Sequence, residues 1–174
     1  MDRKIILNLA ISLDGYIAGK DGGFDWIVGD GEGKADTEKK FEFPKFLEDV
    51  DSVIMGRNCY EQDMHNDFKD KIVYIITSKD MKDYDNVKFI KGDVAKFFLE
   101  EKEKEGKGMF LFGGGILIDT FMKADIIDEF IVGIIPTILG NGRKLFFENN
   151  PETKLVLEEC TVDNGITIMR YTRK

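Results

Sequence analysis

One segment, residues 109–116, restricts the folds of this chain more than any other. An apolar run leads into Gly113-Gly114-Gly115, and a second apolar stretch follows from Ile116. The order predicts a buried strand, a sharp turn and a helix, because residues without Cβ let the backbone turn tightly and let a ligand approach the main chain. A helix that begins there directs unpaired amides and its positive dipole end into the gap, which favours a phosphate group. A tight turn with nothing bound is the alternative.

Strands and helices alternate along the rest of the chain, which is long enough to bury the core of a single domain over residues 1–174. Apolar and β-branched runs mark the strands, and apolar residues at helical spacing mark the helices. We expect strands at 4–11, 52–56, 71–77, 87–90, 109–112, 129–135, 154–162 and 166–172, and helices at 36–49, 94–106 and 116–124. Asn164-Gly165 between the last two strands predicts an antiparallel hairpin. The pattern predicts an α/β fold with a mixed, mostly parallel sheet and helices on both of its faces.

Residues 12–35 contain seven glycines and little that predicts regular structure. A segment of this length is uncommon in a compact domain unless it acts as a lid or a binding loop. We therefore expect a functional loop after the first strand.

Charge and composition exclude several classes of function. The chain carries 33 acidic and 25 basic residues, a net charge of −8, and no basic stripe, so nucleic acid is not an expected partner. No apolar run approaches the roughly 20 residues of a membrane-spanning helix, and no signal peptide is evident, which predicts a cytoplasmic protein without a membrane partner. Two distant cysteines and a single histidine predict reduced thiols and no metal site.

An arginine follows the predicted strand at 52–56. Gly56 ends this strand, and Arg57-Asn58 begin a predicted helix, which places the arginine where ligands bind in open α/β sheets. Its guanidinium fork suits a phosphate group. A surface ion pair is the alternative interpretation of Arg57.

Two hydroxyls and a cation, Thr77-Ser78-Lys79, end the next predicted strand. Hydroxyls that donate to phosphate, next to a positive charge, would complete a monophosphate site beside Arg57. Strands also end in Thr-Ser where no ligand is bound.

A carboxylate, Asp14, follows the first predicted strand in the sequence Ser12-Leu13-Asp14-Gly15. At the mouth of that strand it would orient a polar heterocycle. A carboxylate that caps a turn is the alternative.

Other ligand-binding and catalytic motifs do not fit this sequence. A Rossmann fold has its glycines at the first strand–helix turn, whereas these glycines follow residue 112 and lack the further glycine at the required offset. A P-loop needs Gly-Lys-Ser/Thr, which does not follow the glycines. Ser-His-Asp or Cys-His catalysis has only His65 to draw on.

Four segments in register resemble the dihydrofolate-reductase-like family, and within it the stand-alone proteins similar to the reductase domain of the bacterial bifunctional riboflavin-biosynthesis enzyme (RibD). The matching segments are 12–18, 51–61 around Met55-Gly56-Arg57, 112–115, and a last one that comprises 127–136, 140–142 and 145–146. The resemblance implies a three-layer dihydrofolate-reductase-like fold, NADPH as cofactor and a homodimer. A further hypothesis is an interaction protein, in which the terminal hairpin and the strand at 129–135 pair across a symmetric dimer.

The resemblance assigns roles toward NADPH by position. Backbone groups of Ala10 and Ile17 would hold the nicotinamide carboxamide, the turn at Gly114 would cradle the pyrophosphate, and Arg57 would meet the adenosine 2′-phosphate. The cofactor-binding residues that we predict are Ala10, Ile17, Gly56, Arg57, Asn58, Thr77, Ser78, Lys79, Gly113, Gly114, Gly115 and Ile116. Cys59 stands where the family usually has threonine, so a backbone amide would replace that hydroxyl contact.

The resemblance also implies a reaction: transfer of hydride from NADPH to a C=N or C=O carbon of a pyrimidine, a pterin or a related small heterocycle, as in 5-amino-6-(5-phosphoribosylamino)uracil reductase. Asp14, with a pKa raised by burial, or water that it orders, is the first candidate for the proton donor. Asp30, Glu38 and Glu42 are the alternatives. Trp26 is either a lid residue over the nicotinamide, and so part of the catalytic site, or a core aromatic.

Two other functions are compatible with the same residues. One is dihydrofolate reductase activity, for which Trp26 and Asp30 supply the tryptophan and the acid of the family's pattern but not its proline. The other is a module that binds a nucleotide or a pterin without turnover, which Cys59 in place of threonine favours.

Overall fold

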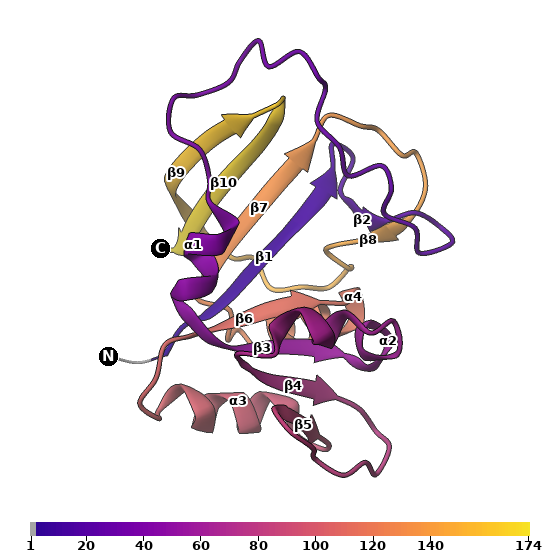
Figure 1. Ribbon diagram of the computed structural model, residues 1–174, viewed down its shortest axis with the longest axis vertical. Helices are drawn as coiled ribbons and strands as arrows, with labels where there is room; N and C mark the ends of the chain where they lie inside the picture. The colour runs from indigo at the N-terminus through magenta and orange to yellow at the C-terminus, as the bar shows by residue number, and fades with distance from the viewer. Residues whose placement is uncertain (1–2) are drawn as a thin grey trace.

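The computed structural model describes residues 3–174. An eight-stranded sheet runs through the molecule in the order β5-β4-β3-β6-β1-β7-β10-β9 (Figure 1). Its strands are β1 (Ile5–Ser12), β3 (Val50–Gly56), β4 (Ile72–Ile76), β5 (Val87–Ile90), β6 (Gly108–Gly113), β7 (Glu129–Ile135), β9 (Leu155–Asp163) and β10 (Ile166–Arg173). Two short strands outside it, β2 (Tyr16–Ala18) and β8 (Arg143–Lys144), pair with each other. The predicted α/β fold with a mixed, mostly parallel sheet is confirmed.

The six strands from β5 to β7 are parallel, and β10 and β9 continue the sheet as the predicted antiparallel hairpin. The carboxyl ends of the parallel strands therefore share one edge of the sheet, on the right in Figure 1. The prediction that the strand at 129–135 pairs across a dimer is wrong, because β7 is hydrogen-bonded within the chain to β1 on one side and to β10 on the other.

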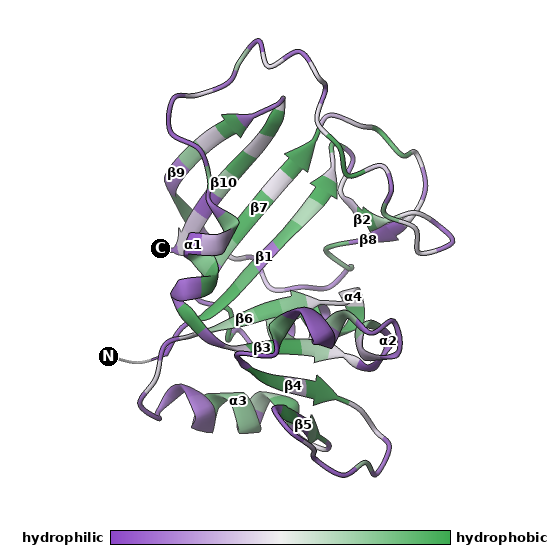
Figure 2. Ribbon diagram, in the orientation of Figure 1, coloured by the Kyte–Doolittle hydropathy of each residue, from purple (hydrophilic) through white to green (hydrophobic). Residues whose placement is uncertain are grey.

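Helices cover both faces of the sheet. They are α1 (Phe43–Glu48), α2 (Arg57–Glu61), α3 (Val94–Lys102), α4 (Gly115–Lys123) and the 3-10 helix η1 (Met64–Phe68). Phe98 of α3 and Phe121 of α4 belong to the core cluster on one face, and Phe46 of α1 and Phe68 of η1 belong to the cluster on the other. In Figure 2 the central strands are mostly green, whereas purple residues lie mainly in the loops and in parts of the helices.

The helix expected at 36–49 is much shorter, because α1 begins only at Phe43. Pro44 occupies its first turn, where proline is tolerated. A helix that extended further upstream would press the proline ring against the carbonyl of Lys40 and would lack an amide donor at Pro44. The upstream residues bond to the terminal hairpin instead: the amide of Thr37 and the Nζ of Lys40 both donate to the carbonyl of Val162, at 3.0 Å each.

The long loop after β1 is partly ordered by the same hairpin. The amides of Asp30 and Gly31 donate to the carbonyl and to Oδ1 of Asn164, both at 2.9 Å. A Cβ on Gly29 would lie 2.3 Å from the side chain of Asn164, so a residue other than glycine does not fit there. The loop thus contains β2 near its start and a segment fixed to the hairpin near its end.

Buried ionic side chains lie at the amino-terminal edge of the sheet. The side chain of Arg3 is only 5% exposed; it pairs with Asp51 and Glu101 and donates to Oγ of Ser52 at 3.0 Å. The hydroxyl of Tyr74 donates to Glu101 at 3.2 Å. Burial, together with the charge of Glu101, raises the pKa of Tyr74 to about 12. Each of these groups has a partner within the fold.

Residues 3–174 include neither a membrane-spanning helix nor a metal-binding cluster. In this range no helix combines the length and apolar character needed to cross a bilayer. The same residues contain no group of three or more His, Cys, Asp or Glu side chains arranged to hold a metal ion.

Candidate active site

The glycine turn connects β6 to α4 at the carboxyl edge of the sheet. Gly113 ends β6 with φ +133°, which disfavours residues with side chains, and its peptide bond to Gly114 is cis. Gly114 precedes α4, and no side chain caps the helix there. A Cβ built on Gly114 would meet no atom within 4 Å. The turn is therefore not filled by side chains and leaves space for a ligand against the backbone.

The register of the sheet brings the predicted phosphate-binding segments together. Met55 in β3 pairs with Gly113, and Gly56 pairs with Ile76 at the end of β4. A Cβ on Gly56 would lie 3.8 Å from both the carbonyl oxygen of Gly113 and the amide nitrogen of Gly114. The start of α2 and the segment after β4 therefore lie at the ends of strands adjacent to the glycine turn.

Arg57 begins α2 with a side chain that is 37% exposed. Its Nε lies 3.2 Å from a carboxylate oxygen of Glu61, one helical turn later, which is an ion-pair distance. The same nitrogen is buried and forms no hydrogen bond. The surface ion pair, the alternative interpretation of Arg57, is thus present. Since Glu61 is half exposed, the pair contributes little free energy and a stronger anion could displace the carboxylate.

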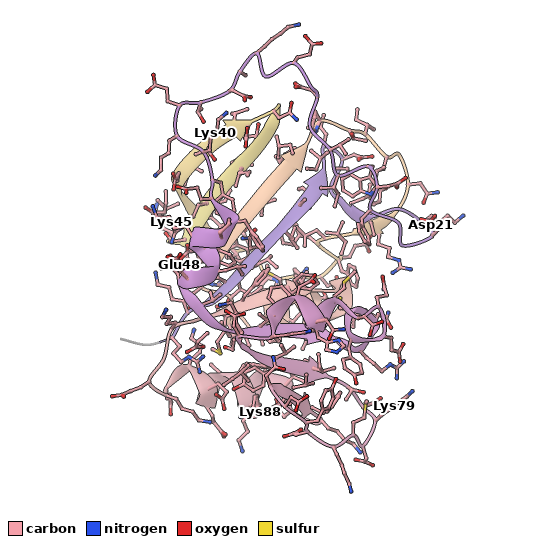
Figure 3. The ribbon with its side chains drawn as sticks, viewed as in Figure 1. Asp21, Lys40, Lys45, Glu48, Lys79 and Lys88 are labelled. Atoms are coloured by element: carbon pink, nitrogen blue, oxygen red, sulfur yellow. The ribbon has the colours of Figure 1, made fainter. Side chains whose placement is uncertain are left out.

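Thr77 is buried and orders the segment that follows β4. Its Oγ1 accepts a hydrogen bond from the amide of Lys79 at 3.1 Å, and its own amide donates to the carbonyl of Ile90 at 3.1 Å. Ser78 and Lys79 are exposed, and Figure 3 shows Lys79 in the loop beyond the end of β4. Thr77 therefore shapes this loop, while the side chains of Ser78 and Lys79 lie at the surface.

The carboxyl half of β1 is only partly covered, although β1 is a central strand. Its residues 8–11, Ala10 among them, are all half-buried. Cδ1 of Ile17 lies 3.5 Å from the position of a Cβ on Gly115, which places β2 against the glycine turn. Ile116, in the first turn of α4, is 76% exposed. The residues predicted to hold the nicotinamide and the pyrophosphate thus border the same partly covered region.

Asp14 does not have the environment of a proton donor. Its carboxylate accepts hydrogen bonds from Oγ of Ser12 at 2.6 Å and from the amides of Leu139 and Gly140 at 3.1 and 2.7 Å. These bonds, that of Ser12 above all, lower the pKa of Asp14, and its side chain is exposed. The expectation that burial raises this pKa is wrong. The carboxylate instead fastens the segment after β1 to the segment after β7.

Trp26 lies in the long loop and belongs to neither core cluster, so its interpretation as a core aromatic is wrong. The ring is half-buried, and Nε1 donates to the carbonyl of Gly23 at 3.2 Å. The alternative proton donors Asp30, Glu38 and Glu42 are all exposed.

Asn8 is a candidate that the sequence reasoning missed. It lies in the partly covered half of β1, and its Nδ2 has no exposed surface and no hydrogen-bond partner. It is the one polar residue in the run 5–11, which is otherwise apolar. This interruption of a strand that is buried on both faces is the signal that could have identified it.

Cys59 lies half-buried in α2, close to the start of the helix. Burial raises the pKa of its thiol. The side chain therefore adds no negative charge beside the predicted phosphate positions.

Two hollows in the surface lie apart from these residues. One, of about 190 Å³, is lined by Phe46 and Arg170 among others, between α1 and the terminal hairpin. The other, of about 390 Å³, lies at His65 and Tyr84 beside η1. Neither is lined by a predicted cofactor residue.

Comparison with known proteins agrees with this arrangement. The family model described as "RibD C-terminal domain" matches residues 3–168. The chain belongs to the RibD C-terminal domain family. YwjB of Bacillus subtilis (strain 168) is 39% identical to this RibD C-terminal domain protein over 178 residues, which cover 99% of each chain.

Solved structures show the fold of the family. A Shewanella sp. PV-4 protein named for riboflavin biosynthesis superposes with a TM-score of 0.81 at 28% identity, over 100% of this chain and 99% of that one. Enterococcus faecalis dihydrofolate reductase, solved with NADP(H), gives a TM-score of 0.65 at 15% identity, over 98% and 96% of the two chains. The three-layer dihydrofolate-reductase-like fold predicted for this RibD C-terminal domain is therefore confirmed, and its family is reductase-like.

Proposed function

We propose that this RibD C-terminal domain protein is an NADPH-dependent reductase that transfers hydride to a small pyrimidine- or pterin-like heterocycle. One observation carries the proposal: the glycine turn has open space at Gly114, and a cation follows each of the two strands beyond it, Arg57 after β3 and Lys79 after β4. Main-chain amides suit a pyrophosphate, and the two cations suit the 2′-phosphate that distinguishes NADPH from NADH. The likeness in fold to a reductase solved with NADP(H) supports it.

The residues present fit the cofactor in both charge and space. When bound, NADPH supplies the hydride. The amides of Gly115 and Ile116 and the positive end of the α4 dipole bind the pyrophosphate. Arg57 and Lys79 bind the 2′-phosphate as a fork and a point charge. Backbone groups of Ala10 orient the carboxamide, so the reacting ring lies over the partly covered half of β1.

Two residues of the long loops complete the proposal. Trp26 would cover the reacting ring from the glycine-rich loop and shield it from bulk water. Because three hydrogen bonds hold the carboxylate of Asp14 in its ionised form, its role is to position the loops at the end of β1, and the proton comes from water.

A second candidate, a module that binds NADPH without turnover, is favoured by one observation. The carboxyl groups considered as proton donors, Asp14, Asp30, Glu38 and Glu42, are all exposed. None of them has the burial that raises a carboxyl pKa toward the working pH.

Titration of the purified protein with NADPH and with NADH tests both candidates. Trp26 is the single tryptophan, so quenching of its emission reports occupancy, and the rise in Tm gives an independent measure. We expect NADPH to bind about tenfold more tightly than NADH, or better. Oxidation of NADPH with a panel of pyrimidines and pterins would support the reductase, and binding without oxidation by any of them would support the module. Absence of NADPH binding would contradict both.

A further inference from the structure

Asn8 faces the side of the sheet that α1 covers. Ile6, two residues earlier, and Ile131, the direct partner of Asn8 in β7, both belong to the core cluster on that side. Side chains alternate along a strand, and paired residues share a face. Ala10, two residues later, therefore lies on the same face, in the partly covered half of β1. Asn8 thus lies between the packed core and the region proposed for the reacting ring.

The side-chain amide of Asn8 has a nitrogen without a hydrogen-bond partner inside the protein. Its Nδ2 has no exposed surface and makes no hydrogen bond. Buried donors almost always have a partner, and one without costs stability. A leucine or an isoleucine, as at the neighbouring positions Ile6, Leu7 and Leu9, would avoid that cost. A hydrogen-bond acceptor on a ligand would also remove it.

The surroundings of this amide suit a flat, uncharged ring. In the parallel register of β1 with β6, Ile6 pairs with Phe110, and Phe112 follows two residues later on the same face, half-buried against the same core cluster. Ile131 lies on the other side of the amide. These two side chains give apolar walls to either side of a single polar group.

The next residue in this row across the sheet is charged but already paired. Arg170 is the partner of Ile131 in β10 and forms an ion pair with the buried carboxylate of Glu129. The polar group in the row that lacks a partner is therefore the neutral amide of Asn8.

We infer that Asn8 is a specificity-determining residue: its Nδ2 donates a hydrogen bond to a carbonyl oxygen on the ring that accepts hydride. The inference rests on the proposed function, because a nicotinamide beside Ala10 brings the accepting ring within reach of Asn8. A neutral amide selects a neutral acceptor on that ring, whereas a carboxylate at position 8 would select an amino-substituted or protonated ring.

Binding of two simple rings to four proteins tests this role. The rings are uracil, which has ring carbonyls, and 2,4-diaminopyrimidine, which has amino groups; each is titrated by ligand-observed NMR with and without NADP⁺. The proteins are the wild type, Asn8→Leu, Asn8→Asp and Asn66→Leu, a control at an exposed asparagine away from the sheet. NADPH affinity and Tm are measured for all four.

We expect Asn8→Leu to weaken uracil binding about tenfold or more, because the donor is lost. It should leave NADPH affinity unchanged and raise Tm, since it removes a buried polar group without a partner. Asn8→Asp should lose uracil at neutral pH and favour 2,4-diaminopyrimidine. It should regain uracil as the pH falls through the pKa of the new carboxyl group, because the protonated acid is again a donor. The wild type and Asn66→Leu should show neither change.

Three results would overturn the role of Asn8. The first is unchanged uracil binding by Asn8→Leu, and the second is a fall in the Tm of Asn8→Leu with an equal loss of NADPH affinity, which would indicate a structural role. The third is no uracil binding by the wild type with or without NADP⁺. The proposed function can fail while the role of Asn8 stands. If the wild type binds uracil through Asn8 but does not bind NADPH, the recognition role stands and the reductase does not.

Discussion

The two edges of the central sheet differ in whether their polar groups have partners within the protein. At the amino-terminal edge, Arg3, Glu101 and Tyr74 are buried together and bonded to one another. At the carboxyl edge, the glycine turn has no side-chain cap, the amide of Asn8 has no partner, and Ile116 is 76% exposed. Because unpartnered buried polar groups cost stability, the first edge stabilises the fold and the second keeps groups that a ligand would satisfy.

This difference separates two kinds of variant. Substitutions at the amino-terminal edge should change the free energy of unfolding and leave cofactor affinity alone. Substitutions at the glycine turn and at Arg57, on the carboxyl edge, should change cofactor affinity and leave the free energy of unfolding nearly unchanged. A residue that changed both quantities equally would contradict the division.

The largest effect is expected for Arg3→Met. Removing Arg3 breaks its pairs with Asp51 and Glu101 and leaves the buried carboxylate of Glu101 with the exposed Lys104 as its remaining cation, so the free energy of unfolding should fall by about 3–5 kcal/mol. Urea denaturation measures this fall, and NADPH affinity, measured on the folded protein, should stay the same. A fall below about 1 kcal/mol would mean that the network contributes little.

The Gly114→Val variant should lose binding of NADPH and of NADH, each by about 100-fold or more, equal to about 2.7 kcal/mol. The φ of Gly114 is −83°, which valine can adopt, and its side chain would occupy open space at the turn. Titration measures the affinities, and Tm should change little.

Gly106→Ala is the matched control at the amino-terminal edge. Its Cβ would lie 2.6 Å from a carboxylate oxygen of Asp51, at φ +155°, so this variant should lower Tm and leave the affinities alone. Normal cofactor binding by Gly114→Val would show that the open space at the turn is not the cofactor site.

Arg57→Gln should weaken NADPH binding about 10- to 100-fold, because a hydrogen bond to a charged group contributes about 1.5–3 kcal/mol. NADH affinity should not change, since NADH has no 2′-phosphate. Lys88→Gln, at an exposed lysine of β5, should affect neither cofactor. An equal loss of both cofactors would place Arg57 at the pyrophosphate and not at the 2′-phosphate.

The smallest effect is expected for Glu61→Gln, which removes the carboxylate that competes with the 2′-phosphate for Arg57. An exposed pair contributes about 0.2–1 kcal/mol, so NADPH should bind about 1.5- to 5-fold more tightly. Salt should reduce the gain, because it screens charges near the surface. Weaker binding would indicate that Glu61 holds Arg57 in its binding position.

Local sequence signals predicted most of the sheet and its carboxyl edge. Three glycines without side chains specified the turn, and the helix expected from residue 94 is α3, which Asp93 caps by accepting a hydrogen bond from the amide of Lys96 at 3.0 Å. The parallel alternation of strands then placed the start of α2 and the segment after β4 beside that turn. The turn, the helix cap and the strand ends are each specified by residues that are close together in the sequence.

The errors came from contacts that are distant in sequence. The helix expected at 36–49 lost its first part because Thr37 and Lys40 bond to the hairpin more than 100 residues later. Asp14 was expected to be buried, but amides from the segment after β7 hold it ionised at the surface. Asn8 does interrupt an apolar run, but its lack of a hydrogen-bond partner depends on the neighbouring strands β6 and β7. Such contacts have no local pattern in the sequence.

Hydrogen–deuterium exchange with and without saturating NADPH tests the cofactor site most directly, because it locates the bound cofactor on the backbone. The account predicts new protection at the first turn of α4, the start of α2 and the segment after β4, with exchange at the amino-terminal edge unchanged. Protection confined to the hollow between α1 and the hairpin, or to the hollow beside η1, would contradict it.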